Sequence, residues 1–137
     1  MLRTLPMRSL LPSLMLGVLA TPSVAGDRSA HDGSWRGVVS SSIQNAVYLD
    51  ATVDGQRAKL HFGEPANCTI VAEHLRDIEG RAFYRFQPPT NGGGFCARLY
   101  PGELTIDTPA SGSIATAFQR AGAPWTGVLR RTNDSKE

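Results

Sequence analysis

Apolar and polar residues alternate one by one along most of this chain, and short runs of turn-forming residues interrupt the alternation at short intervals. From Val47 to Val53 every second residue is apolar, and the alternation resumes from Ala58 to Phe62. Successive side chains of a β-strand point to opposite faces, so a period of two is typical of strands with one buried face. Between the two segments, Asp54-Gly55 predicts a hairpin with a type I′ turn, in which both residues have positive φ. The sequence therefore predicts an all-β fold.

The same pattern predicts eight or nine strands. Their expected bounds are Ser34–Ser41, Val47–Val53, Arg57–Phe62, Cys68–Leu75, Arg81–Gln87, Phe95–Tyr100, Glu103–Asp107, Ser113–Gln119 and Trp125–Arg131. The segment Cys68–Gly80 also fits a helix, because Val71, Leu75 and Ile78 have helical spacing and Gly80 can end a helix. We expect a strand there and keep the helix as the alternative. Short strands separated by turns favour a sandwich or a barrel.

Two segments near the ends of the chain share the pattern W-x-G-V. They begin at Trp35 and at Trp125, with Gly37 and Gly127 as their glycines. In a closed up-and-down barrel the first and last strands pair, and a glycine beside a large indole permits the sharp coiling that closure demands. We therefore expect one small antiparallel up-and-down β-barrel of about eight strands, closed by these four residues together with Arg130.

Bulky residues occupy the positions that such a barrel turns inward. They are Val47, Leu49, Val53, Leu60, Phe62, Tyr84, Phe86, Leu104, Ile106, Ile114, Phe118 and Leu129. Eight strands enclose a space just wide enough for side chains or for one small ligand. We expect a packed interior rather than a cavity, which leaves binding to the loops and one open end.

Residues 1–25 have the composition of an export signal, with Arg3 and Arg8 before an apolar run and small residues up to Ala25. Cleavage is expected after Ala25, with an uncleaved N-terminal anchor as the alternative. The apolar run falls short of the roughly 20 residues of a membrane span. We expect a flexible segment over residues 26–33, a β-barrel domain over 34–131 and a flexible tail over 132–137. An excess of Arg over Lys is typical of GC-rich bacterial genomes. For an exported bacterial protein the expected compartment is the periplasm.

The net charge of +2 belongs entirely to the leader, because 12 of the 14 Lys and Arg residues and all 12 Asp and Glu residues follow it. A neutral domain lacks the basic footprint of a nucleic-acid binder. We therefore expect no binding to DNA or RNA.

The chain contains two cysteines, Cys68 and Cys96. In an oxidising compartment two lone cysteines most simply pair with each other. Their disulfide would close a loop of about 28 residues, worth about 3–4 kcal/mol in the chain-entropy model. The chain has no C-x-x-C, and no histidine lies at zinc-ligand spacing from either cysteine, so no metal and no cofactor are expected.

No catalytic motif is present in the sequence. His31, His61 and His74 stand in none of the coordinating spacings, and there is no G-x-S-x-G. We expect all three histidines on the solvated surface, and we predict that the protein is not an enzyme.

A long connection rich in proline and glycine precedes Cys96, running from Pro88 through Asn91 to Phe95. One interpretation is a disulfide-anchored docking loop tipped by Phe95. Its partner-binding residues would be Asn91 and Phe95, with Arg81, Arg85 and Arg98 nearby on outward faces. The alternative interpretation is an ordinary hairpin loop.

The segment Gly33-Ser34-Trp35, at the start of the first expected strand, resembles the G-x-W of the calycin superfamily of lipocalin-like and avidin-like barrels. In lipocalins that tryptophan packs under an arginine from the end of the barrel, which implies this role for Arg130 or Arg131. Within the superfamily, the chain is similar in size, compartment and cysteine count to small periplasmic inhibitors of secreted bacterial metalloproteases. Those inhibitors plug the protease cleft with an N-terminal segment that would correspond to Gly26–Asp32. Their first cysteine follows the tryptophan closely, whereas Cys68 here lies far beyond Trp35.

These features favour an exported periplasmic protein-binding module that inhibits or neutralises another protein. The expected partner is a secreted or periplasmic enzyme, or a delivered toxin against which this chain acts as an immunity protein. A small lipocalin-like carrier of an apolar ligand is one alternative, which the filled interior disfavours. An envelope-associated sensor or assembly module is the other.

Overall fold

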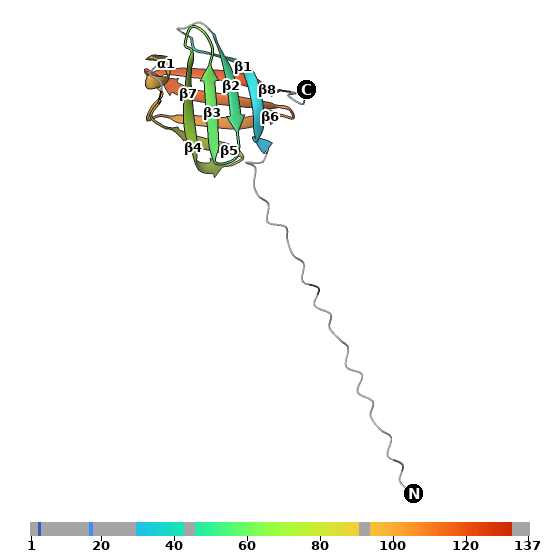
Figure 1. Ribbon diagram of the computed structural model, residues 1–137. Coiled ribbons are helices and arrows are strands. Elements are labelled where there is room, and N and C mark those ends of the chain that lie inside the picture. Colours follow the sequence, from blue (N-terminus) through green and yellow to red (C-terminus); the bar gives the residue numbers. More distant parts are fainter. Residues whose placement is uncertain (1–2, 4–16, 18–29, 43–45, 91–93, 133–137) are drawn as a thin grey trace.

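Eight antiparallel strands form one closed barrel in the computed structural model, which describes residues 3, 17, 30–42, 46–90 and 94–132 (Figure 1). The strands are β1 (Gly33–Ser40), β2 (Val47–Val53), β3 (Arg57–Phe62), β4 (Cys68–Ile78), β5 (Arg81–Phe86), β6 (Glu103–Ala110), β7 (Ser113–Arg120) and β8 (Ala123–Arg131). Each strand pairs with its neighbours in the chain, and β1 pairs with β8. The predicted all-β, up-and-down barrel is therefore confirmed. The proposed export signal, residues 1–25, lies almost wholly outside the described residues.

The seam between β1 and β8 closes the barrel through the two W-x-G-V segments. Gly37 lies opposite Leu129, and Gly127 lies opposite Val39. A Cβ atom on Gly37 would stand 2.5 Å from the carbonyl oxygen of Val128, and one on Gly127 would stand 2.9 Å from the Cα of Val39. Both glycines are thus required for the close approach of the two strands, as the sequence pattern predicted.

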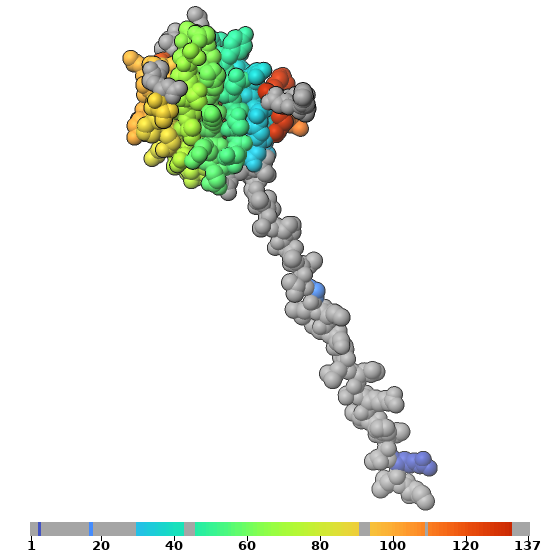
Figure 2. Space-filling view, viewed as in Figure 1, coloured from blue at the N-terminus to red at the C-terminus, as the bar shows by residue number. Residues whose placement is uncertain are grey.

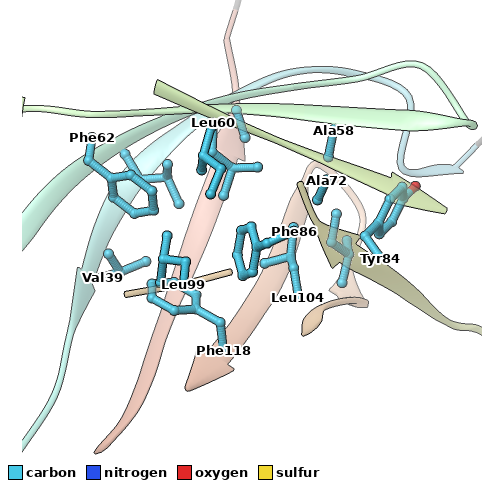
Figure 3. Packing of buried hydrophobic residues seen from close by; sticks show 14 of the residues in the cluster. Val39, Ala58, Leu60, Phe62, Ala72, Tyr84, Phe86, Leu99, Leu104 and Phe118 are labelled. Carbon is cyan, nitrogen blue, oxygen red and sulfur yellow. The ribbon is translucent and has the colours of Figure 1, made fainter. Parts of the chain in front are cut away.

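The interior of the barrel is filled by side chains from all eight strands. Figure 3 shows part of this packing, with Leu60, Phe86 and Phe118 pointing toward one another. Every position predicted to face inward is buried. Aromatic rings meet at one end, where Phe118 contacts both Phe62 and Phe86 edge-on, at 5.8 Å and 6.0 Å between ring centroids. In the space-filling view, β1 to β4 form a continuous wall (Figure 2).

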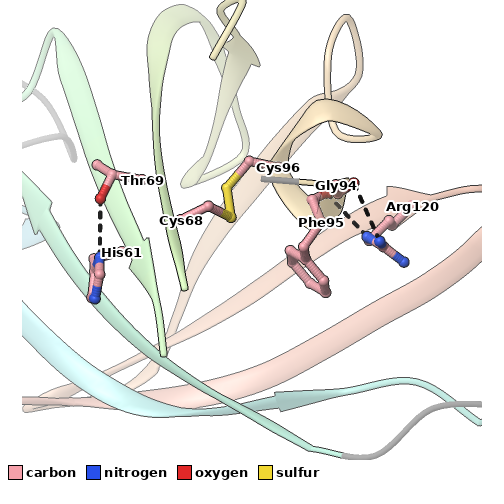
Figure 4. Close-up of a disulfide and its surroundings, with 7 residues drawn as sticks. All are labelled: His61, Cys68, Thr69, Gly94, Phe95, Cys96 and Arg120. Carbon is pink, nitrogen blue, oxygen red and sulfur yellow. Dashed lines mark hydrogen bonds between the residues drawn. A yellow bond between two sulfur atoms is a disulfide. The ribbon is translucent and has the colours of Figure 1, made fainter. Parts of the chain in front are cut away.

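A short helix, α1 (Gly94–Ala97), closes the aromatic end of the barrel (Figure 4). The prediction of a strand over Phe95–Tyr100 is wrong. Phe95, Cys96 and Leu99 are all buried in the core, and only a helical turn places three residues with this spacing on one face, since a strand would send Phe95 and Cys96 to opposite sides. The amide of Leu99 donates to the carbonyl of Cys96 at 3.0 Å and continues the turn.

Two side-chain contacts hold α1 in place. Cys96 forms a disulfide with Cys68 at the start of β4, which confirms the predicted pairing. From β7, Arg120 donates from Nε to the carbonyl of Phe95 at 3.0 Å, and its guanidinium carbon lies 4.1 Å from the centroid of the Phe95 ring. Burial lowers the pKa of Arg120, with a further contribution from nearby Arg98, but an arginine stays charged throughout the physiological range.

The opposite end is closed where the chain enters β1. His31 is 1% exposed, which corrects the expectation that it lies in a flexible, solvated tail. The indole nitrogen of Trp35 donates to the carbonyl of His31 at 2.8 Å. Arg131 covers the Trp35 ring at 4.2 Å and donates to the carbonyl of Asp32 at 2.7 Å. The arginine over the tryptophan is therefore Arg131 and not Arg130, which has the outward phase of β8 and pairs with Arg36 across the seam.

β4 settles the choice between strand and helix for residues 68–80. It is a strand that runs to Ile78, beyond the predicted end at Leu75. The ladder with β5 shifts register between His74 and Arg76, which leaves Leu75 in a bulge. Leu75 and Ile78 are both exposed, so their helical spacing with Val71 reflects the bulge and not a buried helical face.

The predicted hairpin at Asp54-Gly55 is confirmed, although its turn is not of type I′. Gly55 has a φ of 85°, but Asp54 does not have positive φ. The loop extends to Gln56, and the Asp54 carboxylate accepts a hydrogen bond from the amide of Arg57 at 3.0 Å. A three-residue loop therefore replaces the predicted two-residue turn.

Candidate protein-binding face

The residues proposed for a docking loop are separated by the fold. Phe95 is only 9% exposed, and its ring packs against Phe62 and Trp125 at centroid distances of 4.8 Å and 5.1 Å. The expectation that Phe95 projects toward a partner is therefore wrong, because the ring fills the end of the barrel instead. Asn91 lies outside the described residues. Arg98 is exposed beside α1, whereas Arg81 and Arg85 lie together on β5.

A ladder of alternating charges covers the outside of β3 to β6. In register across these four strands stand Arg57, Glu73, Arg85 and Glu103. The contacts are 3.5 Å between Arg57 and Glu73 and 3.4 Å between Arg85 and Glu103. Cross-strand neighbours of opposite sign stabilise a sheet modestly. The two arginines and two glutamates of the ladder therefore neutralise one another.

Glu103 is the most strongly engaged carboxylate of the ladder. It accepts a hydrogen bond from Arg76 at 2.9 Å in addition to the bond from Arg85. The hydrogen bond from Arg76 is the main cause that lowers the pKa of Glu103, and partial burial opposes it. Arg76 also lies over the outward ring of Phe83, 4.5 Å from its centroid.

The other side of the barrel, formed by β2, β1, β8 and β7, carries an uncharged row. Tyr48, Val38, Val128 and Ala115 stand in register across these four strands. The exposed fractions of the first three are 69%, 40% and 54%. We call these four residues the apolar row. Half of the six large hydrophobic residues that are exposed in the described part of the chain belong to it.

A shallow depression of about 320 Å³ continues the apolar row toward β5. Its floor consists of small residues from β6, β7 and β8, and the ion pair of Arg81 with Asp107 borders it. The lining residues are Arg81, Thr105, Asp107, Ala115, Thr116, Ala117, Thr126, Gly127 and Val128. Of the predicted partner-binding residues, Arg81 is thus the one beside the apolar row.

The histidines do not form a site. His61 faces outward and shares a hydrogen bond with Thr69 at 3.0 Å. His74 is mostly buried, which corrects its expected solvation; it contacts Asp77 at 2.9 Å and packs edge-on against Tyr84. Among the described residues, no cluster of three or more His, Cys, Asp or Glu side chains has the geometry to hold a metal ion. Over the same residues, no helix has the length and apolar character needed to cross a membrane.

Comparisons with protein-family models, curated proteins and solved structures find no match to this chain. The resemblance to calycins is therefore one of architecture and local motif. The closed eight-stranded antiparallel barrel is compatible with it, and so is the arginine stacked on Trp35.

Proposed function

We propose that this chain is an exported protein-binding module that inhibits or neutralises another protein, and that it binds this partner through the apolar row. The observation that carries the proposal is the exposure of Tyr48, Val38 and Val128 side by side on a barrel whose interior is already filled. The leader composition and the disulfide support export. The expected partner is a secreted or periplasmic enzyme or a toxin.

The closed barrel directs binding to its outer side chains. A carrier of an apolar ligand needs interior space, and aromatic and aliphatic side chains occupy that space here. A sheet that closes on itself has no unpaired edge strand, so a partner cannot add a strand of its own. The outward side chains of the strands then offer a surface for contact with a partner.

The chemistry of the apolar row suits the centre of an interface. Binding energy concentrates in a few apolar or aromatic side chains that are fully desolvated on contact, surrounded by polar groups that exclude water. Tyr48 supplies a large ring with a polar tip, and the valines offer rigid branched surface. Thr126 and the Arg81–Asp107 ion pair provide a polar border.

The test is capture of a partner followed by reconstitution. The exported protein would be purified from the periplasm with its bound proteins, alongside the variants V128E and L75E. Leu75 is the matched control, because it is an exposed aliphatic residue on β4, away from the row. We expect one protein to copurify with the wild type and with L75E but not with V128E.

The captured protein would then be purified alone and its activity measured with and without this chain. Inhibition by the wild type and by L75E, with at least about tenfold weaker inhibition by V128E, supports the proposal. An activity that all three forms leave unchanged contradicts inhibition. Equal capture by V128E and the wild type contradicts the assignment of the face.

A further inference from the structure

Two arginines stand side by side next to the apolar row. Arg36 on β1 lies opposite Arg130 on β8, one step along the outward faces from Val38 and Val128. Both arginines are exposed. Across the paired positions of the described strands, this is the one place where two charges of the same sign face each other. Like charges directly opposite each other destabilise a sheet.

The pair is only half neutralised. Arg36 forms an ion pair with Asp50 on β2. Arg130 has no carboxylate partner in the part of the chain that the structure describes, and its other cross-strand neighbour is Ser113. The outward positions of β1, β8 and β7 contain no Asp or Glu at all. This differs from the ladder on β3 to β6, where each arginine faces an acid.

An excess positive charge beside exposed apolar side chains fits an acidic group on the partner. Guanidinium groups bind carboxylates through parallel hydrogen bonds of defined geometry, and two of them in register offer several such donors. In natural proteins, local rules of this kind are broken chiefly at functional or strained sites. The apolar neighbours add a second requirement, since Val38 and Val128 favour an aliphatic side chain close to that acid.

We propose that Arg36 and Arg130 bind a carboxylate side chain of the partner protein, while an adjacent aliphatic side chain of the same partner packs on Val38 and Val128. This inference rests on the proposed function and specifies the chemistry of the partner. A protein is favoured over an anionic membrane because the apolar row lies along a sheet face and only Tyr48 offers a side chain large enough to enter a bilayer surface.

The probe is the blocked dipeptide acetyl-Leu-Glu-amide, titrated into the exported protein and followed by amide chemical shifts. We expect saturable changes at residues 36, 38, 128 and 130, with affinity in the millimolar range. Acetyl-Leu-Gln-amide, which lacks the charge, is expected to bind at least about threefold more weakly, because the charge-assisted hydrogen bonds are lost. The variant R130Q should show the same loss toward the glutamate peptide, whereas R98Q, at the α1 end of the barrel, should leave the affinity unchanged.

Equal binding of the two peptides, or no saturable change at these residues, would overturn the proposal. So would binding to phosphatidylglycerol vesicles that R130Q abolishes, if the dipeptide gives no response, since the ligand would then be a lipid phosphate. The proposed function fails separately. If V128E loses a captured partner but R130Q does not, the carboxylate site is refuted and the binding face stands. If the dipeptide binds as expected but no partner protein is captured, the carboxylate site stands and the proposed function as an inhibitor is refuted.

Discussion

Gly127 of β8 lies opposite Val39 of β1, so close that a Cβ atom on the glycine would stand 2.9 Å from the Cα of Val39. This contact lies at the seam that turns an open sheet into a closed barrel. The barrel presents the apolar row as a continuous surface only because the seam joins β1 to β8, which contribute its two valines.

Replacing Gly127 with Ala should therefore destabilise the barrel by about 3 kcal/mol or more, because backbone atoms of β1 would have to move. The matched control is Gly94→Ala in α1, where a Cβ atom meets nothing within 4 Å. Urea unfolding of both variants measures the difference. A loss below about 1 kcal/mol for Gly127→Ala would contradict the close approach of the strands.

Arg131 seals the end of the barrel at which the chain enters β1. The variant Arg131→Met should lower the free energy of unfolding by about 1–2 kcal/mol, because it removes the contact with the Trp35 ring and the hydrogen bond to the carbonyl of Asp32. Arg130→Met, on the outward face, should change stability by less than about 0.5 kcal/mol. Denaturant unfolding monitored by tryptophan fluorescence compares the two. Equal effects would mean that stacking on Trp35 contributes nothing.

The disulfide joins α1 to β4 across 28 residues of chain. We expect the double variant Cys68→Ser, Cys96→Ser to lose about 2–4 kcal/mol of stability, because the unfolded chain regains the entropy that the closed loop removes. Limited proteolysis should also cut the variant faster between residues 87 and 102. A variant that unfolds at the same denaturant concentration as the wild type would assign the bond no structural role.

Glu103 should make the charged ladder sensitive to acid. Its pKa is lowered in the folded state, chiefly by the hydrogen bond from Arg76. A carboxylate with a depressed pKa adds stability above its unfolded pKa and loses that stability as the pH falls through the folded value. The free energy of unfolding of the wild type should therefore exceed that of Glu103→Gln by about 0.5 kcal/mol at pH 7 and by less at pH 3.

The matched control for this pH comparison is Glu64→Gln, in the loop between β3 and β4. Glu64 forms no ion pair among the described residues. Its replacement should give no such pH-dependent difference. A difference in the free energy of unfolding between wild type and Glu103→Gln that stays constant from pH 7 to pH 3 would contradict the role given to the Arg76 hydrogen bond.

The architecture could be predicted from the sequence because local patterns determine it. Alternation with a period of two placed six of the eight strands to within two residues at each end, whereas β4 and β6 were each expected to end three residues early. The repeated W-x-G-V located the closure. The cysteine count gave the disulfide.

The two barrel ends could not be predicted, because their closure depends on contacts between distant residues. The sequence around Phe95 does not show that its ring packs against Phe62 and Trp125, which are distant in the chain. The glycines before it indicated an exposed loop instead. His31 likewise follows a polar stretch, yet hydrogen bonds from Trp35 and Arg131 to backbone carbonyls hold its segment against the barrel. In each case tertiary packing overrode a local preference.

The apolar row was detectable in part. Tyr48 occupies an outward phase of its strand, and the valine of each W-x-G-V segment has the phase opposite to its tryptophan. What the sequence lacks is the register that places Val38 between Tyr48 and Val128. Only the pairing of β2, β1 and β8 brings these three outward apolar residues together as one surface.

Photo-crosslinking from single positions in the periplasm tests the binding face most directly. A photoreactive amino acid would replace Val38 in one variant and Leu75 in another, and both are exposed aliphatic residues. The account predicts a crosslink to one partner protein from position 38 and none to that protein from position 75. A partner crosslinked from position 75 but not from position 38 would contradict it.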